Sequence, residues 1–318
     1  MRLAWVVGSG GLLGSALCRT LSLAGTTLFV PKERFSWTIS SKLFTQITES
    51  VQSFASQAES ADCWEIYWAA GTGTMSSRTE TLATETQAIE CLLKRLKADS
   101  RLLKKPGFIA YASSAGAIYA ASEDEVITEK TIPTPTTAYA LEKLSQERLI
   151  HSFQAETENV TALIARISTL YGVGQSFKKA QGLLSHIARC LIRRHPVQIY
   201  VPYDTMRDYI FADDAAIAMV KVLRSPRELP NFLIKIIASE RPATIAEIIS
   251  IFKRLERRAP LIVTSANKLG RLYTRRVQFR STVVPELTVP KKSLFIGVAQ
   301  MMAAERTAFA RAKSNKIF

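Results

Sequence analysis

The sequence contains few of the residues that bind metals or form disulfide bonds. Among its 318 residues are only 4 cysteines and 3 histidines. No Cys-x-x-Cys pair occurs, and no histidine stands at a metal-ligand spacing from a cysteine. We therefore expect no metal site, and we expect reduced, mostly buried thiols in a cytoplasmic protein.

Long apolar runs and internal repeats are absent as well. No stretch of about 18 apolar residues is present, so we expect no membrane span. The apolar start from Leu3 to Cys18 is interrupted by four glycines, which is not the pattern of a secretory signal peptide. With 47% hydrophobic residues, the chain has enough apolar material for one large domain or two closely packed ones.

Acidic residues are scarce relative to basic ones. Asp and Glu total 27 against 42 Lys and Arg, which gives a formal net charge of +15. Such a balance suits an anionic partner: a phosphorylated small molecule, a nucleic acid or a membrane surface. The basic residues are scattered in single positions and short pairs, which favours solvated faces over a continuous nucleic-acid-binding stripe. Nucleic acid is therefore not the partner that we expect.

Short apolar segments alternate with helical segments through the first half of the sequence. The expected strands cover residues 3–7, 26–30, 65–68, 107–112 and 160–167. Helices are expected between them, to about residue 24 and over 41–58, 79–98 and 137–155. This alternation predicts an α/β fold, a doubly wound parallel sheet. Beyond residue 172, helices near 180–194 and 244–257 and strands at 197–201 and 232–237 predict a smaller lobe over the carboxyl edge of the sheet.

A glycine-rich turn follows the first expected strand. Gly8, Gly11 and Gly14 are spaced three apart and precede a helix. Glycine permits a tight turn and lets backbone N–H groups approach a pyrophosphate at the N-terminus of that helix. In this strand–turn–helix context the pattern predicts a dinucleotide site.

The residues after the second strand bear on the type of dinucleotide. An acidic residue there would bond the adenosine ribose hydroxyl of NAD. Here the residues are Lys32, Glu33 and Arg34. Glu33 could serve NAD, whereas Lys32 and Arg34 could pair with the extra phosphate of NADP. We expect NAD or NADP, with a slight preference for NADP.

Tyr139 and Lys143 form the most informative pair of residues. They are four residues apart on an expected helix and so lie on the same face. A nearby ammonium favours the phenolate, and a free tyrosine titrates near pH ~10, so this help would make Tyr139 a usable base. Ser113 and Ser114 precede the pair, at the end of an expected strand. The pair is common by itself and gains weight from these surroundings.

Several of these features fall at the carboxyl ends of expected strands. They are the glycine turn, the segment from Ala69 to Gly71, the two serines, and the segment from Ser168 to Gly172. Ligands of doubly wound sheets bind at that edge. The sequence therefore predicts one shared site.

Taken together, these segments resemble the extended short-chain dehydrogenase/reductase superfamily, in particular its NAD-dependent epimerase/dehydratase family, which acts on nucleotide sugars. The similarity runs from Gly8 to about residue 255. Its motifs are Tyr67–Gly71, Tyr111–Tyr119, Thr137–Lys143, Arg166–Gly172 and Arg207–Asp214. The resemblance implies a Rossmann-type NAD(P)-binding domain over residues 1–171. It implies a mostly substrate-binding lobe over residues 172–318, with the chain crossing back to the sheet.

The resemblance also implies roles for individual residues. Gly8, Gly11 and Gly14 would hold the cofactor pyrophosphate, and Ala69, Ala70 and Gly71 would line its adenosine side. Lys143 would bond the nicotinamide ribose. Tyr139 would move the proton of a sugar hydroxyl, and Ser114 would bond the same oxygen.

The substrate residues implied in the same way come mostly from the second lobe. Arg207 would bind the substrate pyrophosphate, because its guanidinium is a bidentate and permanently charged fork. The other candidates are Thr169, Gln181 and Tyr200. A plainer alternative for Arg207 is an ion pair with a neighbouring acid such as Asp208 or Asp213.

Some positions depart from the family pattern. Thr169 and Glu85 each stand where the family has an asparagine, and residues 36–62 lack the Gly-Asp that ends the family's third strand. Ala115 and Gly116 occupy the places where family dehydratases carry an acidic pair. A 4,6-dehydratase is therefore disfavoured.

The reaction implied is hydride transfer at a sugar carbon that bears a hydroxyl or a ketone. An epimerase, which keeps its cofactor, and a keto-reductase, which releases it, both stay open. A different class is a catalytically silent NAD(P)-binding scaffold or sensor, which could contact nucleic acid. Because Tyr139, Lys143 and a serine are all present, we expect an enzyme, and by resemblance a homodimer.

Overall fold

The centre of the fold is a six-stranded parallel sheet in the order β2-β1-β3-β4-β5-β9. The computed structural model describes residues 1–71, 73–74, 77, 79–175, 182–225, 230–257, 260–264, 277–287, 289 and 291–314. The strands of this sheet are β1 (Arg2–Val7), β2 (Thr27–Phe29), β3 (Cys63–Trp68), β4 (Gly107–Ser114), β5 (Val160–Ile167) and β9 (Phe232–Ile237).

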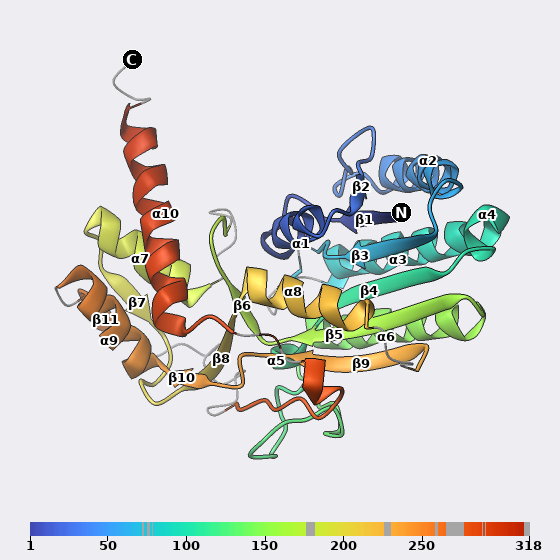
Figure 1. Ribbon diagram of the computed structural model, residues 1–318. Coiled ribbons are helices and arrows are strands. Elements are labelled where there is room, and N and C mark those ends of the chain that lie inside the picture. The colour runs from blue at the N-terminus through green and yellow to red at the C-terminus, as the bar shows by residue number, and fades with distance from the viewer. Residues whose placement is uncertain are drawn as a thin grey trace.

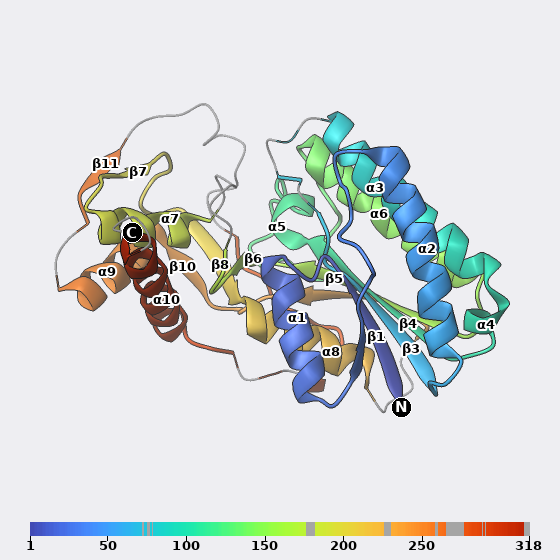
Figure 2. The same ribbon diagram turned by 90° about the horizontal axis from the view of Figure 1, so that it is seen from above.

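Helices cover both faces of this sheet, as the apolar character of its strands requires. One face is covered by α2 (Ser40–Ala58), α3 (Thr79–Ala98) and α6 (Ala138–Ala155). The other is covered by α1 (Leu12–Leu23) and α8 (Ala212–Leu223), which pack side by side (Figures 1 and 2). The short helices α4 (Ser100–Leu103) and α5 (Ala115–Ile118) flank β4. The chain is therefore doubly wound.

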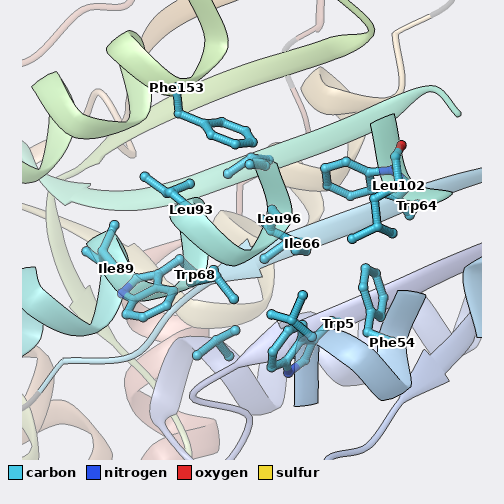
Figure 3. Packing of buried hydrophobic residues seen from close by; sticks show 14 of the residues in the cluster. Trp5, Phe54, Trp64, Ile66, Trp68, Ile89, Leu93, Leu96, Leu102 and Phe153 are labelled. Carbon is cyan, nitrogen blue, oxygen red and sulfur yellow. The ribbon is translucent and has the colours of Figure 1, made fainter. Parts of the chain in front are cut away.

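Aromatic side chains fill the core on the face under α2 and α3 (Figure 3). Phe54 of α2 lies with its ring centroid 5.5 Å from that of Trp5 and 6.3 Å from that of Trp64. Such pairs add about 0.5–1.5 kcal/mol beyond the burial of their area. They fix α2 against β1 and β3.

The sheet ends at β2, and no strand lies beyond it among the described residues. The segment that joins β2 to α2 instead carries two aromatic residues back onto the core. The ring centroids of Phe35 and Trp5 are 6.3 Å apart. Those of Trp37 and Trp68, at the end of β3, are also 6.3 Å apart. This path accounts for the missing Gly-Asp of the family's third strand, because the structure has no strand in that place.

Where the structure describes it, the second part of the chain forms two small sheets and three helices. One sheet has the order β10-β8-β6, from β6 (Thr169–Tyr171), β8 (Met206–Phe211) and β10 (Pro242–Thr244), and the other pairs β7 (Val197–Ile199) with β11 (Ile262–Thr264). The helices are α7 (Leu183–Arg193), α9 (Ile245–Glu256) and α10 (Leu294–Ser314), and a short 3-10 turn, η2 (Pro285–Leu287), precedes α10. An apolar cluster of its own joins these pieces.

This second part lies beyond the carboxyl ends of the main strands (Figure 2). β6 follows β5 after one residue, Ser168, and so leads directly from the main sheet into the smaller one. The chain then returns to the main sheet through β9, which pairs with β5. The division into domains at residue 171 stays a prediction. Within the described residues, none of the helices combines the length and the apolar character needed to cross a membrane.

Candidate active site

The glycine turn joins β1 to α1 at the carboxyl edge of the sheet. Gly8 has φ +91°, and a Cβ there would lie 2.6 Å from the backbone N of Ala70. A Cβ at Gly14 would lie 2.0 Å from the carbonyl oxygen of Gly8. Both contacts are with backbone atoms, which cannot swing away, so these positions require glycine.

The segment from Ala69 to Gly71 lies against this turn. The Ala69 N–H donates to the carbonyl oxygen of Val7 at 2.9 Å, which continues the pairing of β3 with β1 beyond the strand. Gly71 has φ +154° and is exposed. The residues predicted to hold the pyrophosphate and those predicted to line the adenosine side are therefore neighbours in the structure.

The start of α1 has the features that a dinucleotide pyrophosphate requires. Gly11 is the N-cap, and no side chain caps the first turn of the helix. A Cβ built at Gly10 would have no heavy atom within 4 Å, so the turn has open space beside it. N–H groups at a helix start and the positive end of the helix dipole favour a phosphate there. The residues of the glycine turn therefore fit the pyrophosphate of a dinucleotide.

Tyr139 lies in the first turn of α6. The helix begins at Ala138 because Thr137 caps it, with its hydroxyl accepting the Ala140 N–H at 3.2 Å. The Ser114 side chain, at the end of β4, forms a hydrogen bond with Tyr139. The hydroxyl of its neighbour Ser113 donates instead to Glu147, two turns further along α6, at 2.6 Å. Of the two serines, Ser114 is therefore the one beside the phenol.

The pKa of Tyr139 moves in the direction opposite to that expected from Lys143. Burial and the negative charge of Glu85 raise the pKa of Tyr139 to about 12, while the hydrogen bond from Ser114 acts in the lowering direction. The support that Lys143 would give to a phenolate stays a prediction. At neutral pH the phenol is protonated in this arrangement.

Lys143 is engaged with a second tyrosine. Its Nζ donates to the hydroxyl of Tyr111 at 3.0 Å and lies 5.0 Å from the centre of that ring. The same Nζ is 5.8 Å from the centre of the Tyr139 ring. Tyr111 comes from β4 and is fully buried. The ammonium thus lies between the two phenols and bonds the deeper one.

A buried ion pair joins α6 to β5 next to the site. Glu147, one turn after Lys143 on α6, accepts from Arg166 at 2.6 and 3.0 Å, and Arg166 also donates to the hydroxyl of Tyr119 at 2.5 Å. Ser113 completes the set through Glu147. This network ties α6 to β4, β5 and α5. Sequence reasoning missed Glu147, although its i,i+4 spacing from Lys143 was a usable signal.

The residues after β2 are exposed and differ in their contacts. Glu33 accepts from the amide of Gln46 at 3.1 Å and pairs with Lys42 at 3.7 Å. These contacts hold Glu33 toward α2. Lys32 and Arg34 lie exposed on either side of it.

The predicted substrate residues are dispersed over the second part of the chain. Thr169 starts β6 and is paired in register with Tyr209 of the adjacent strand β8. Arg207 lies two residues before Tyr209 on the same strand. Arg207 donates to the carbonyl oxygen of Met206 at 2.7 Å. Tyr200 follows β7, is 43% exposed and bonds Gln198. Gln181 lies outside the described residues.

The acids considered as alternative partners of Arg207 have partners of their own. Asp208 is buried and accepts from the hydroxyls of Ser168 at 2.6 Å and Ser239 at 2.8 Å. Asp213 pairs with Arg19 at 2.5 Å. Asp208 thus serves to join the main sheet to β8.

The sequence matches the model of the NAD dependent epimerase/dehydratase family over residues 4–236. The chain belongs to this family. NAD(P) is the typical cofactor of the family, and its members act on nucleotide sugars.

Curated relatives match over a shorter segment. A dTDP-L-rhamnose 4-epimerase from Burkholderia thailandensis is 29% identical over 106 residues, which is 33% of this chain and 29% of that protein. A dTDP-4-dehydro-6-deoxyglucose reductase from Escherichia coli is 31% identical over 106 residues, 33% of each chain. The matched segment thus spans about a third of the length of these relatives.

Solved structures of the family match the whole fold. UDP-glucose 4-epimerase from Thermotoga maritima, solved with UDP-glucose, superimposes with a TM-score of 0.79 at 19% identity and covers 97% of this chain and 100% of its own. RMD from Pseudomonas aeruginosa, complexed with NADPH, gives a TM-score of 0.77 at 20% identity and covers 96% of this chain and 98% of its own. These matches establish the shared architecture.

Proposed function

We propose that this protein is an NAD(P)-dependent enzyme that transfers hydride at a hydroxyl- or ketone-bearing carbon of a nucleotide sugar, with Tyr139 as the acid/base. One observation carries the proposal. The phenol of Tyr139 is bonded by Ser114 at the same sheet edge as the glycine turn, with the Lys143 ammonium 5.8 Å from its ring. Bound there, the nicotinamide supplies the hydride donor or acceptor.

Each residue of the site has a distinct task in this proposal. Tyr139 holds the proton that enters or leaves the sugar oxygen, and Ser114 positions that oxygen by a second hydrogen bond. Lys143, held by Tyr111, binds the ribose of the cofactor. Gly8, Gly11 and Gly14 let the N-terminus of α1 meet the pyrophosphate.

The cofactor that the site suits best is NADP, by a narrow margin. The position that would select NAD holds Glu33, whose carboxylate is engaged with Gln46 and Lys42. Two exposed cations, Lys32 and Arg34, remain for a 2′-phosphate. Structures of the same fold hold either cofactor: RMD is complexed with NADPH, and UDP-glucose 4-epimerase from Thermus thermophilus with NAD.

The substrate we propose is a nucleotide sugar bound between the main sheet and β6–β8. The relatives named above act on or bind dTDP- and UDP-sugars. Arg207 and Thr169 stand on adjacent strands where the chain leaves the main sheet, and Arg207 is suited to a diphosphate. Gln181 and Tyr200 complete the proposed substrate set. A homodimer is also part of the proposal.

Dehydration is not part of the proposed activity. It needs an acid–base pair next to the reacting carbons. After Ser114 come Ala115, which is buried, and Gly116, neither of which can carry a proton. Epimerisation and keto-reduction are the two remaining reactions.

The test begins with cofactor binding and ends with turnover. Purified protein is titrated with NAD⁺, NADH, NADP⁺ and NADPH, and nucleotide sugars and their 4-keto derivatives are then screened. We expect Tyr139→Phe to bind cofactor with nearly unchanged affinity and to lose about 10²–10⁴-fold in turnover. Retained turnover in this variant would overturn the role of Tyr139. Failure to bind any of the four cofactors would overturn the enzyme proposal and favour a silent scaffold.

A further inference from the structure

One buried carboxylate stands beside the proposed acid/base and has no task in the mechanism above. Glu85 is only 3% exposed, and its Oε1 accepts the N–H of Gly73 at 2.7 Å. Two other acids of α3 face outward: Glu80 is exposed, and Glu90 pairs with Lys94 at 2.8 Å. Burying a carboxylate is costly, so its place next to a titratable site residue points to a functional reason.

Glu85 and Tyr139 both lie against Gly73. A Cβ at Gly73 would lie 3.5 Å from Oε1 of Glu85 and 3.3 Å from Cδ2 of the Tyr139 ring. The other oxygen of Glu85, Oε2, would lie 3.2 Å from a Cβ at Gly71. The Glu85 carboxylate thus lies against Gly71 and Gly73, and the Tyr139 ring lies beside the same Gly73.

The ionisable groups on the described elements around Tyr139 have contacts of their own. Lys143 on α6 is 5.8 Å from the ring centre, but its Nζ bonds Tyr111 of β4. Glu142 on α6 accepts from Thr86 of α3, and Glu147 is paired with Arg166. A carboxylate near a phenol in a desolvated site opposes the phenolate. Burial is the larger cause and the charge of Glu85 adds to it, and together they raise the pKa of Tyr139 to about 12.

We propose that Glu85 is a positioning residue that keeps Tyr139 in its protonated form and thereby sets the site to donate a proton, which is the direction of keto-sugar reduction. The inference rests on the proposed function. In that direction the Tyr139 proton passes to the ketone oxygen while the carbonyl carbon accepts hydride from the reduced cofactor. The ketone is reduced to a hydroxyl, the nicotinamide is oxidised, and the phenolate regains a proton from solvent.

The opposite direction should be slow at neutral pH for the same reason. Oxidation of a sugar hydroxyl needs Tyr139 as phenolate, and that form is scarce below its pKa. The oxidation rate should therefore rise with pH well above neutrality, whereas the reduction rate stays level there.

The decisive variant is Glu85→Gln, which removes the charge and keeps an acceptor oxygen for the Gly73 N–H. The ionisation of Tyr139 is followed by ultraviolet absorbance titration of the protein without substrate, and it is identified as the signal lost in Tyr139→Phe. We expect the acid dissociation constant of Tyr139 to increase about tenfold in Glu85→Gln. The pH profile of oxidation should move to lower pH by the same factor. Glu80→Gln, an exposed charge on the same helix, is the control and should change neither.

An unchanged Tyr139 ionisation in a folded Glu85→Gln variant would overturn the inference. If Glu85→Gln does not fold, the unsubstituted protein is titrated alone. Ionisation of its Tyr139 at the pH of a free phenol would also overturn the inference. The titration uses no substrate. A failure of the proposed function would appear instead as absent cofactor binding or turnover, so the two outcomes are distinguishable.

Discussion

Lys143 bonds Tyr111, with 3.0 Å between the Nζ and the phenol oxygen. Tyr111 also bonds Gln146, which in turn donates to Thr86 at 2.8 Å. The ammonium is therefore fixed by Tyr111 of β4, whose hydroxyl is held in turn by Gln146 of the helix that carries the lysine. Its position between two phenols is a product of packing.

Removing the hydroxyl of Tyr111 should destabilise the protein. In Tyr111→Phe, buried polar groups of Lys143 and Gln146 lose a partner, and we expect a cost of about 1–3 kcal/mol. Urea denaturation measures it. Tyr203→Phe, at a tyrosine that is 45% exposed, is the control and should cost less than about 0.5 kcal/mol. Equal effects of the two changes would contradict a structural role for the Tyr111 hydroxyl.

The glycine turn should tolerate a methyl group at one position and not at another. Gly14→Ala would place Cβ 2.0 Å from the carbonyl oxygen of Gly8, so we expect a loss of about 1–3 kcal/mol or more in the free energy of unfolding. Gly10→Ala meets nothing within 4 Å and should leave the stability nearly unchanged. Chemical denaturation of both variants, without cofactor, makes the comparison. A stable Gly14→Ala protein would show that the turn can rearrange.

The exposed cations after β2 should determine the preference between the two cofactors. We expect the double change Lys32→Ala and Arg34→Ala to weaken NADPH binding by about tenfold or more, because a charged hydrogen bond to phosphate contributes about 1.5–3 kcal/mol. NADH binding should stay nearly constant. Lys42→Ala removes a cation that pairs with Glu33 and serves as the matched control. A parallel loss for both cofactors would mean that these cations do not read the 2′-phosphate.

Glu129 should make stability depend on acid pH. Burial raises its pKa, but hydrogen bonds from Ser281, Thr282 and Ile236 outweigh burial and hold the pKa below the ordinary 4.5. A lowered folded-state pKa means that the carboxylate stabilises the fold above its unfolded pKa, and that this contribution is lost as pH falls through the folded value.

Glu129→Gln should therefore lower stability at neutral pH and lose less of it on acidification than the unsubstituted protein. Urea denaturation at neutral pH and at about pH 4 measures both effects. Glu123→Gln, at an exposed site in the same segment, should change neither. A full acid dependence in Glu129→Gln would assign the effect to other carboxylates.

Local sequence patterns predicted the elements of the main sheet in their order along the chain. The helix over 79–98 and the strands over 160–167 and 232–237 have the predicted bounds, and the glycine turn and Tyr139 lie where local pattern placed them. Such features depend on residues close together in the chain, on the period of apolar positions and on turn chemistry. The family assignment follows from the same local motifs.

Only the tertiary structure decided which groups meet. The bond from Lys143 to Tyr111 joins residues 32 positions apart, and the contact of Glu85 with Gly73 depends on how α3 packs beneath the edge of the sheet. The strand β8 and the helix α10 were not predicted, and β8 pairs with β6 and β10 from distant parts of the chain. Local pattern fixes an element, whereas the charge environment of Tyr139 follows from long-range packing, since burial and neighbouring charges together set the acidity of a phenol.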